Sequence, residues 1–168
     1  MSPRPAELVA QLRDIGLFGG LGDQVLQGLA DTLELVELQP GSVAFREGDN
    51  GREMFVLLAG EMEVLKRSKR DVEARVAILG PSDWFGEMSI LDVMPRSATV
   101  RAIAPSRLLR VTAHDLDALY RRDLRSYTLL VLNIAREMSR RLRVADSLLA
   151  ELVANMLDEY ARPRRPGI

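Results

Sequence analysis

The residue types best suited to bind an anion lie in the segment FGEMSILDVMPRSATV, called here the 85–100 segment. Arg96 follows a proline and supplies a fork of N–H donors that suits one negative charge. Gly86 permits close backbone approach, and residues 87–91 can form about one helical turn, whose first backbone N–H groups are free to face an anion; Met88 and Ser89 are ligand-binding candidates in this turn. Glu87 is an acceptor suited to a sugar hydroxyl. The segment therefore favours a cyclic phosphate with an attached ribose.

Other chemistries lack the residues that they need. A triphosphate site would require a glycine-rich loop, a lysine and magnesium ligands, and no such set is evident. The chain has no cysteine, which excludes disulfides and thiolate metal sites. Its single histidine, His114, stands at an expected helix start, where a surface or capping role is expected. A metal-dependent enzyme, such as a cupin, needs a histidine cluster, so we expect neither catalysis nor a metal cofactor.

The composition is that of an ordinary soluble globular protein: 168 residues, 47% hydrophobic and 28% charged. A net charge of −1 gives no long-range field to attract nucleic acid or an anionic membrane. The N-terminus lacks the apolar core of a signal peptide, and no apolar run approaches membrane-spanning length. We therefore expect a cytoplasmic protein without DNA or membrane as partners.

The elements that must position the 85–100 segment are short strands between turns. After two helical stretches, at residues 6–15 and 22–33, the hydrophobic period changes to two. The strands are expected at residues 35–38, 43–45, 54–58, 62–65, 72–79, 99–103 and 107–111. Such regular spacing indicates an α+β protein, with an antiparallel β jelly-roll barrel, N-terminal helices and a long C-terminal helix.

The C-terminal region reads as helical after residue 111. Thr112 and Asp115 resemble an N-cap pair for a helix at residues 114–122. A second helix is expected at residues 126–160, which contain no glycine or proline. It carries apolar residues spaced alternately four and three apart, the heptad signature of a coiled coil. They are Val131, Ala135, Met138, Leu142, Ala145, Leu149, Leu152 and Met156.

Two interpretations of this heptad seam remain open. The helix could pack on its own domain, which suits its N-terminal half, or form a parallel homodimer, which suits its C-terminal half and which we favour. The expected organisation is a β-roll with flanking helices at residues 1–125, a dimerisation or capping helix at residues 126–160, and a disordered tail at residues 161–168.

The 85–100 segment resembles the phosphate-binding cassette of the cyclic nucleotide-binding domain family. That cassette reads F-G-E, a hydrophobic stretch, then P-R, a small residue and A-T. The matching positions are Phe85, Gly86, Glu87, Pro95, Arg96, Ser97, Ala98 and Thr99. The upstream glycine and proline turns are also similar, and the resemblance covers roughly residues 17–158.

The resemblance implies a role for each matching residue. Arg96 would bind the equatorial phosphate oxygens, while Ser97 and Ala98 would offer backbone amides and the Ser97 hydroxyl would face phosphate or base. Glu87 and the Gly86 backbone would hold the ribose 2′-hydroxyl. An apolar wall for sugar and base would come from three residues expected to be buried with or without ligand: Val64, Val76 and Leu79.

The long helix is similar to the dimer helix of bacterial catabolite activator proteins, which implies that Arg141 approaches the pocket near Glu87. At two positions of this helix, catabolite activators offer a threonine and a serine to adenine. At the matching positions this chain has Ala145 and Asp146. Asp146 could accept from the adenine amino group or from the paired N–H donors of guanine. We therefore place cAMP first, on family frequency, and cGMP close behind.

Catabolite activators continue into a DNA-reading domain, but only a few residues follow Tyr160. We therefore expect a stand-alone regulatory sensor that binds a cyclic mononucleotide and signals to a protein partner through helix rearrangement. The alternative is a ligand-free structural or interaction module with a degenerate cassette, in which Glu87 and Arg96 simply pair with each other.

Overall fold

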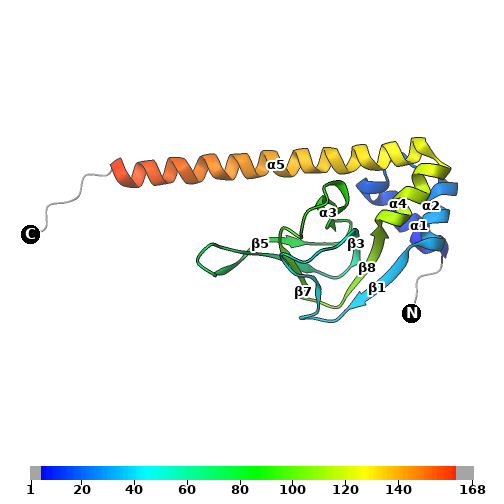
Figure 1. Cartoon of the computed structure of the whole chain (residues 1–168), viewed down its shortest axis with the longest axis horizontal. Helices are drawn as coiled ribbons and strands as arrows, with labels where there is room; N and C mark the ends of the chain where they lie inside the picture. The colour runs from blue at the N-terminus through cyan, green and yellow to red at the C-terminus, as the bar shows by residue number, and fades with distance from the viewer. Residues whose placement is uncertain (1–4, 162–168) are drawn as a thin grey trace, which may run out of the picture. The chain divides into compact units, whose positions relative to one another are not determined.

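The computed structural model describes residues 5–161 of the chain, so most of the tail expected to be disordered lies outside the described residues. Helices occur at both ends and strands between them (Figure 1). The helices are α1 (Pro5–Asp14), η1 (Gly16–Phe18), α2 (Asp23–Thr32), α3 (Met88–Leu91), α4 (Ala113–Arg122) and α5 (Leu124–Ala161). The strands are β1 (Glu34–Leu38), β2 (Val43–Phe45), β3 (Glu53–Ala59), β4 (Met62–Arg67), β5 (Glu73–Leu79), β6 (Trp84–Phe85), β7 (Thr99–Ala102) and β8 (Ser106–Thr112).

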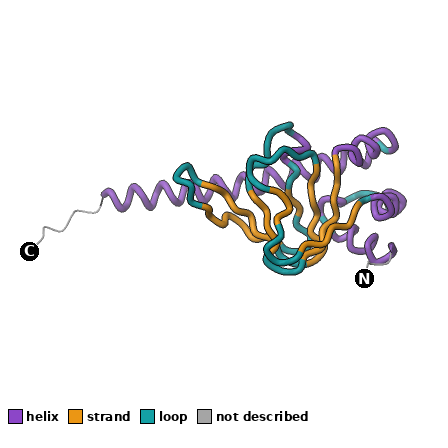
Figure 2. Tube along the Cα trace, turned by 60° about the horizontal axis from the view of Figure 1, so that its bottom comes forward, coloured by secondary structure: helices purple, strands orange, loops and turns teal. Residues whose placement is uncertain are grey.

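The strands form two four-stranded sheets, ordered β1-β8-β3-β6 and β2-β7-β4-β5, with antiparallel pairs throughout. Figure 2 shows the strands in orange, joined by teal loops and turns. Every neighbour pair but β4 and β5 joins strands that are distant in the sequence. A hydrophobic core lies between the sheets and draws side chains from both. Its buried members are Phe55, Leu57, Met62, Leu79, Phe85, Val100, Ala102 and Leu108.

Strand β3 is buried on both faces, and the core between the sheets covers one of them. Phe55 and Leu57 point into the core between the sheets, while Met54 and Val56 on the alternate positions are equally buried. Gln11 of α1 donates from Nε2 to the carbonyl oxygen of Leu58 at 2.6 Å. This strand therefore forms a rigid base for the residues at its N-terminal end.

The predicted α+β class, with antiparallel strands, N-terminal helices and a long C-terminal helix, is confirmed. The predicted N-cap of α4 is also confirmed, because Thr112 Oγ1 accepts from the Asp115 N–H at 3.2 Å and Asp115 Oδ2 accepts from the Thr112 N–H at 2.8 Å. His114 is exposed, as expected. Strand β6 was not predicted, because two residues are too few to show a period.

Helix α5 begins two residues earlier than predicted, because Asp123 caps it. Asp123 Oδ1 accepts from the Ser126 N–H at 3.1 Å, and Asp123 Oδ2 accepts from Ser126 Oγ at 2.7 Å. The hydrogen bond from the Ser126 hydroxyl, with that from its backbone N–H, lowers the pKa of the Asp123 carboxyl below its ordinary value. A single residue thus ends α4 and starts α5.

The chain divides into two compact units, the first ending at Asn133 and the second beginning at Ile134 within α5. The second unit is a single helix in the part of the chain that the structure describes. None of the helices within residues 5–161 has the length and apolar character needed to span a bilayer.

The Asp123 cap generates a prediction about pH. Because its folded pKa is lowered, the charged carboxylate stabilises the fold at pH values above the ordinary Asp pKa of about 3.9, and this contribution is lost as the pH falls through the folded pKa. Asp123→Ser keeps an oxygen acceptor that does not titrate. Wild type should therefore melt at a higher temperature than Asp123→Ser at pH 7, and the difference should close towards pH 3. A difference that is equal at both pH values would contradict this role.

Candidate functional site

Arg96 is held by the connection between β2 and β3. Its backbone N–H donates to the Asp49 carbonyl oxygen at 2.8 Å, and its carbonyl oxygen accepts from the Gly48 N–H at 2.9 Å. Its side chain is only 1% exposed. The structure therefore fixes the backbone of Arg96 on both sides and buries the charge that the sequence singled out.

The Arg96 guanidinium is oriented by contacts from three parts of the chain. Nη1 donates to the carbonyl oxygens of Glu53 at 2.7 Å and Gly86 at 3.1 Å. Nη2 donates to Glu53 Oε1 at 2.8 Å, which completes an ion pair. The guanidinium carbon lies 4.0 Å from the centroid of the Phe45 ring, a cation–π contact. The counter-charge of Arg96 is therefore Glu53, and the expectation that an empty cassette would pair it with Glu87 is wrong.

The Arg96 guanidinium retains unused donors. An arginine has five N–H groups, and the three hydrogen bonds above use both on Nη1 and one on Nη2. Nε is buried and has no hydrogen-bond partner among the described residues. Nη2 has one hydrogen on the Nε side and one on the Nη1 side; with Glu53 bound to the latter, the former and the Nε–H make a fork that can bind two oxygens of one phosphate or carboxylate. A buried, unsatisfied donor of this kind is costly without such a partner.

Two glycines leave the space that the guanidinium occupies. A Cβ atom on Gly51 would lie 2.5 Å from Arg96 Nη2 and 2.8 Å from Nε. A Cβ on Gly86 would lie 2.9 Å from Arg96 Nη1, and the φ angle of +86° at Gly86 also favours glycine. Both positions therefore require glycine so that the arginine can stay buried.

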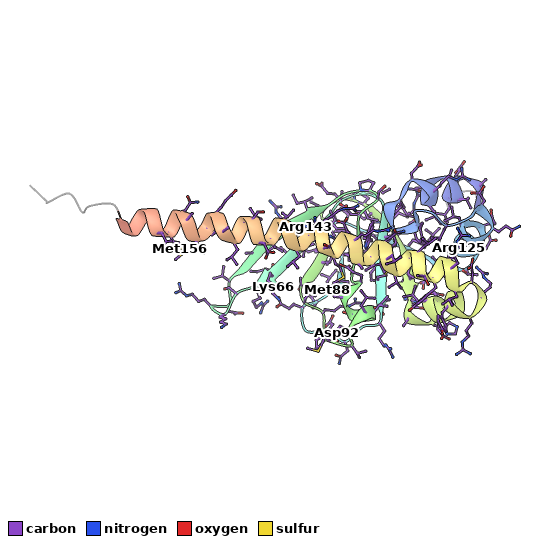
Figure 3. All side chains as sticks on the ribbon, turned by 90° about the horizontal axis from the view of Figure 1, so that it is seen from above. Lys66, Met88, Asp92, Arg125, Arg143 and Met156 are labelled. Carbon is purple, nitrogen blue, oxygen red and sulfur yellow. The ribbon has the colours of Figure 1, made fainter. Side chains whose placement is uncertain are left out.

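Lys66 of β4, labelled in Figure 3, binds the end of the 85–100 segment through hydrogen bonds. Its Nζ donates to the Ser97 carbonyl oxygen and to Glu47 Oε1, the latter at 2.7 Å. Glu47 Oε2 accepts from the Arg67 N–H at 2.9 Å, and the Glu47 N–H donates to Thr99 Oγ1 at 2.9 Å. The Lys66 hydrogen bond, with the backbone bond from Arg67, lowers the pKa of the Glu47 carboxyl.

The remaining predicted residues of the segment surround Arg96 in sequence but differ in exposure. Glu87, at the N-cap position of α3, and Ser89 are buried. Met88 and Ser97 are exposed, and the Ser97 Oγ lies 3.7 Å from Met88 Sδ. Met88, the first residue of α3, and Asp92, the C-cap that follows it, are labelled in Figure 3. Because the N–H groups at residues 90 and 91 both donate to the Glu87 carbonyl, the amides of Met88 and Ser89 remain as candidates for an anion.

The predicted apolar wall is only partly as expected. Leu79 is buried opposite Met62, and Val64 packs against the core. Val76, however, is 60% exposed, so the expectation that all three would be buried in either case is wrong. Val76 lies in β5, an edge strand, at a bulge where the register against β4 shifts. The bulge and the missing neighbour strand leave its side chain uncovered.

Arg141 and Asp146 belong to the second unit. Arg141 Nε donates to Glu137 Oε1 at 3.2 Å, one turn earlier in α5, and Asp146 is exposed. Their predicted approach to the pocket stays a prediction.

Reasoning from the sequence missed four residues that hold the site: Phe45, Gly51, Glu53 and Lys66. From the sequence, Gly51 can be read only as part of a turn, whereas in the structure it leaves space for the guanidinium. For Glu53 the available signal was indirect, because a buried arginine requires an acidic partner. Nothing local distinguishes Glu53 from the other acids of the chain.

Comparisons with known proteins agree on one family. The model for the cyclic nucleotide-binding domain matches residues 35–123. A CRP-like cAMP-activated global transcriptional regulator of Mycobacterium tuberculosis is 30% identical over 138 residues, which cover 82% of this chain and 60% of the relative. The cyclic AMP receptor protein of Thermus thermophilus is 32% identical over 130 residues, 77% of this chain and 58% of the relative. The chain thus spans about 60% of the length of these curated relatives.

Solved structures show the same similarity. The crystal structure of the Thermus thermophilus catabolite activator protein superposes with a TM-score of 0.73 at 32% identity, covering 82% of this chain and 63% of that one. A cyclic nucleotide-binding domain from Methylobacillus flagellatus has a TM-score of 0.77 at 24% identity, covering 88% and 83%. The second similarity is evidence of the fold alone.

The Gly51 contact predicts a specific destabilisation. Gly51→Ala should displace the guanidinium, which three hydrogen bonds hold in place, and lower the free energy of unfolding by about 1–3 kcal/mol in denaturant titration. Gly80→Ala is the matched control, because a Cβ at Gly80 meets nothing within 4 Å. Equal stabilities of the two variants would show that the packing around Arg96 is loose.

Proposed function

The chain belongs to the cyclic nucleotide-binding domain family, and on this premise we propose that it is a sensor that holds a cyclic mononucleotide in the 85–100 segment. One observation carries the proposal. The buried Arg96 has an Nε–H without a hydrogen-bond partner among the described residues, beside a remaining N–H on Nη2. These two donors can bind a phosphate as a fork, and without a ligand the Nε–H stays unsatisfied.

The proposed binding mode assigns one chemical task to each residue of the segment. Arg96 neutralises the single phosphate charge and orients it through two hydrogen bonds, while the amides of Ser97 and Ala98 add donors. Glu87 accepts a hydrogen bond from the ribose 2′-hydroxyl, with the Gly86 backbone beside it. Val64, Val76 and Leu79 form the apolar side, and the exposed Val76 is the member whose area a bound base would cover. The role is binding, without catalysis and without a metal.

The base is the less determined part of the proposal. The names of two relatives include cAMP, which supports cAMP as the first candidate. At the helix positions where catabolite activators offer hydroxyls, this chain has Ala145 and the acceptor Asp146. An aspartate suits the paired N–H donors of guanine, which keeps cGMP as the second candidate. Arg141 is assigned to the Glu87 side of the same pocket.

The proposed output is a rearrangement of helices. Ligand would draw the 85–100 segment inward together with Leu91, and the junction of α4 and α5 around Asp123 would change its angle. A ligand can shift this equilibrium only by its differential affinity for the two states, typically about 1–3 kcal/mol. A partner protein in the cytoplasm would then recognise the altered surface.

We further propose that α5 forms a parallel homodimer. Along the second unit the seam residues Leu142, Leu149, Leu152 and Met156 are all exposed within this single chain. Two such helices would bury these side chains against each other as knobs in holes.

The first test is calorimetric titration of wild type with cAMP and cGMP. Arg96→Lys keeps the positive charge but removes the fork, so affinity should fall roughly 10- to 100-fold. Arg101→Lys is the matched control, because Arg101 is also an ion-paired arginine, bound to Glu63 at 2.7 Å on the neighbouring strands. Its affinity should equal that of wild type. Undiminished binding by Arg96→Lys would show that the nucleotide binds elsewhere.

Thermal melting with and without nucleotide distinguishes the sensor from a ligand-free module. In such a module Glu53 would be the lasting counter-charge of Arg96, and no phosphate would bind. A ligand that binds only the folded state, supplied at 100 times its dissociation constant, stabilises it by about 2.7 kcal/mol. The midpoint should therefore rise with at least one of cAMP and cGMP. An unchanged midpoint with both would favour the ligand-free module.

The dimer is tested by sedimentation equilibrium. Leu152→Glu places a charge in the proposed seam and should convert a dimer to a monomer. Val144→Glu is the matched control, because Val144 is 60% exposed against 61% for Leu152 but lies at an outer position of the heptad, off the seam. Loss of the dimer in both variants, or in neither, would argue against this seam.

A further inference from the structure

Glu53 shares the guanidinium that the proposed ligand needs. Its Oε1 accepts from Arg96 Nη2 at 2.8 Å, and its Oε2 accepts from the Arg52 N–H at 3.1 Å. The Glu53 side chain is 33% exposed, whereas that of Arg96 is 1% exposed. The carboxylate therefore lies on the more exposed side of the ion pair, and it uses one of the two nitrogens that form the free fork.

The charge of Glu53 is not needed to orient Arg96. The two hydrogen bonds from Nη1 end on backbone carbonyl oxygens, and one of these oxygens is that of Glu53 itself, which a change of side chain preserves. The Phe45 ring and the contact with Gly51 restrain the plane of the guanidinium. The backbone hydrogen bonds to Gly48 and Asp49 fix the residue at its base.

A phosphate at the free fork of Arg96 would therefore meet an arginine whose charge is already neutralised. It would also lie close to the Glu53 carboxylate, because both anions would contact Nη2. Like charges at such a separation repel, and solvent at the partly exposed Glu53 reduces this repulsion without removing it.

We propose that Glu53 sets the affinity of this site by competing with the ligand's phosphate for Arg96. The inference rests on the proposed function and adds to it a residue that weakens binding. Its consequence is a sensor that responds at a higher nucleotide concentration than the 85–100 segment alone would dictate.

Glu53→Gln separates the charge from the geometry. The amide oxygen of glutamine can still accept from Arg96 Nη2, while the competing charge is gone. In calorimetric titration this variant should bind the nucleotide about three- to tenfold more tightly than wild type, and the gain should shrink as salt is added. Its melting temperature without ligand should fall, because a charged pair becomes a neutral one. Opposite changes in affinity and stability distinguish competition from a merely structural role.

Glu34→Gln is the matched control, because it removes one carboxylate from another ion pair, with Arg110 on β1 and β8. It should leave affinity unchanged. In an Arg96→Lys background, Glu53→Gln should give a smaller gain, since the competition acts through the fork. If wild type binds the nucleotide and Glu53→Gln binds it with equal or lower affinity, this inference is overturned while the proposed function stands. Absence of cAMP and cGMP binding in both proteins would overturn the proposed function as well.

Discussion

The buried charge of Arg96 is the constraint on which this end of the barrel depends. A guanidinium removed from water is costly unless it is paired and hydrogen-bonded. The structure meets this cost with the Glu53 carboxylate, two backbone carbonyl oxygens and the face of Phe45. The glycines at 51 and 86 follow from the same constraint, because any side chain there would occupy the space of the guanidinium. The turn before β3 and the start of the 85–100 segment are thus shaped around one side chain.

The features that could be predicted from the sequence are those that local patterns determine. The change of hydrophobic period identified the strands and helices, and the glycine-to-threonine spacing located the 85–100 segment. The partners of Arg96 could not be found in this way, because sheet pairing brings them together from distant positions. Phe45 and Glu53 lie at least 43 residues before Arg96 in the sequence, and the pairing of β3 with β6 brings the start of the segment to β3. The alternative in which Glu87 pairs with Arg96 rested on proximity in sequence, whereas the fold supplies Glu53 as the partner.

The exposure of Val76 has a similar cause. An alternating apolar strand predicts a buried face, but whether that face is covered depends on the position of the strand in its sheet. Strand β5 lies at an edge, with a bulge at Val76, while its C-terminal Leu79 lies opposite the buried Met62. One strand therefore joins the core at one end and presents an open apolar surface along most of its length. From the residue types alone, only the burial at the Leu79 end of β5 could be inferred.

The two units also divide the proposed recognition. Every contact that holds the Arg96 charge comes from residues before position 134, whereas the positions that would discriminate the base, Ala145 and Asp146, follow it in the second unit. If both take part, phosphate binding supplies affinity within the barrel, and base recognition adds a second link to the helix besides the junction of α4 and α5. A nucleotide with an unsuitable base would then bind through Arg96 yet shift the helix weakly, because coupling requires differential contacts in the two states. Affinity and response would therefore be set by different residues, Glu53 and Arg96 for one and Asp146 for the other.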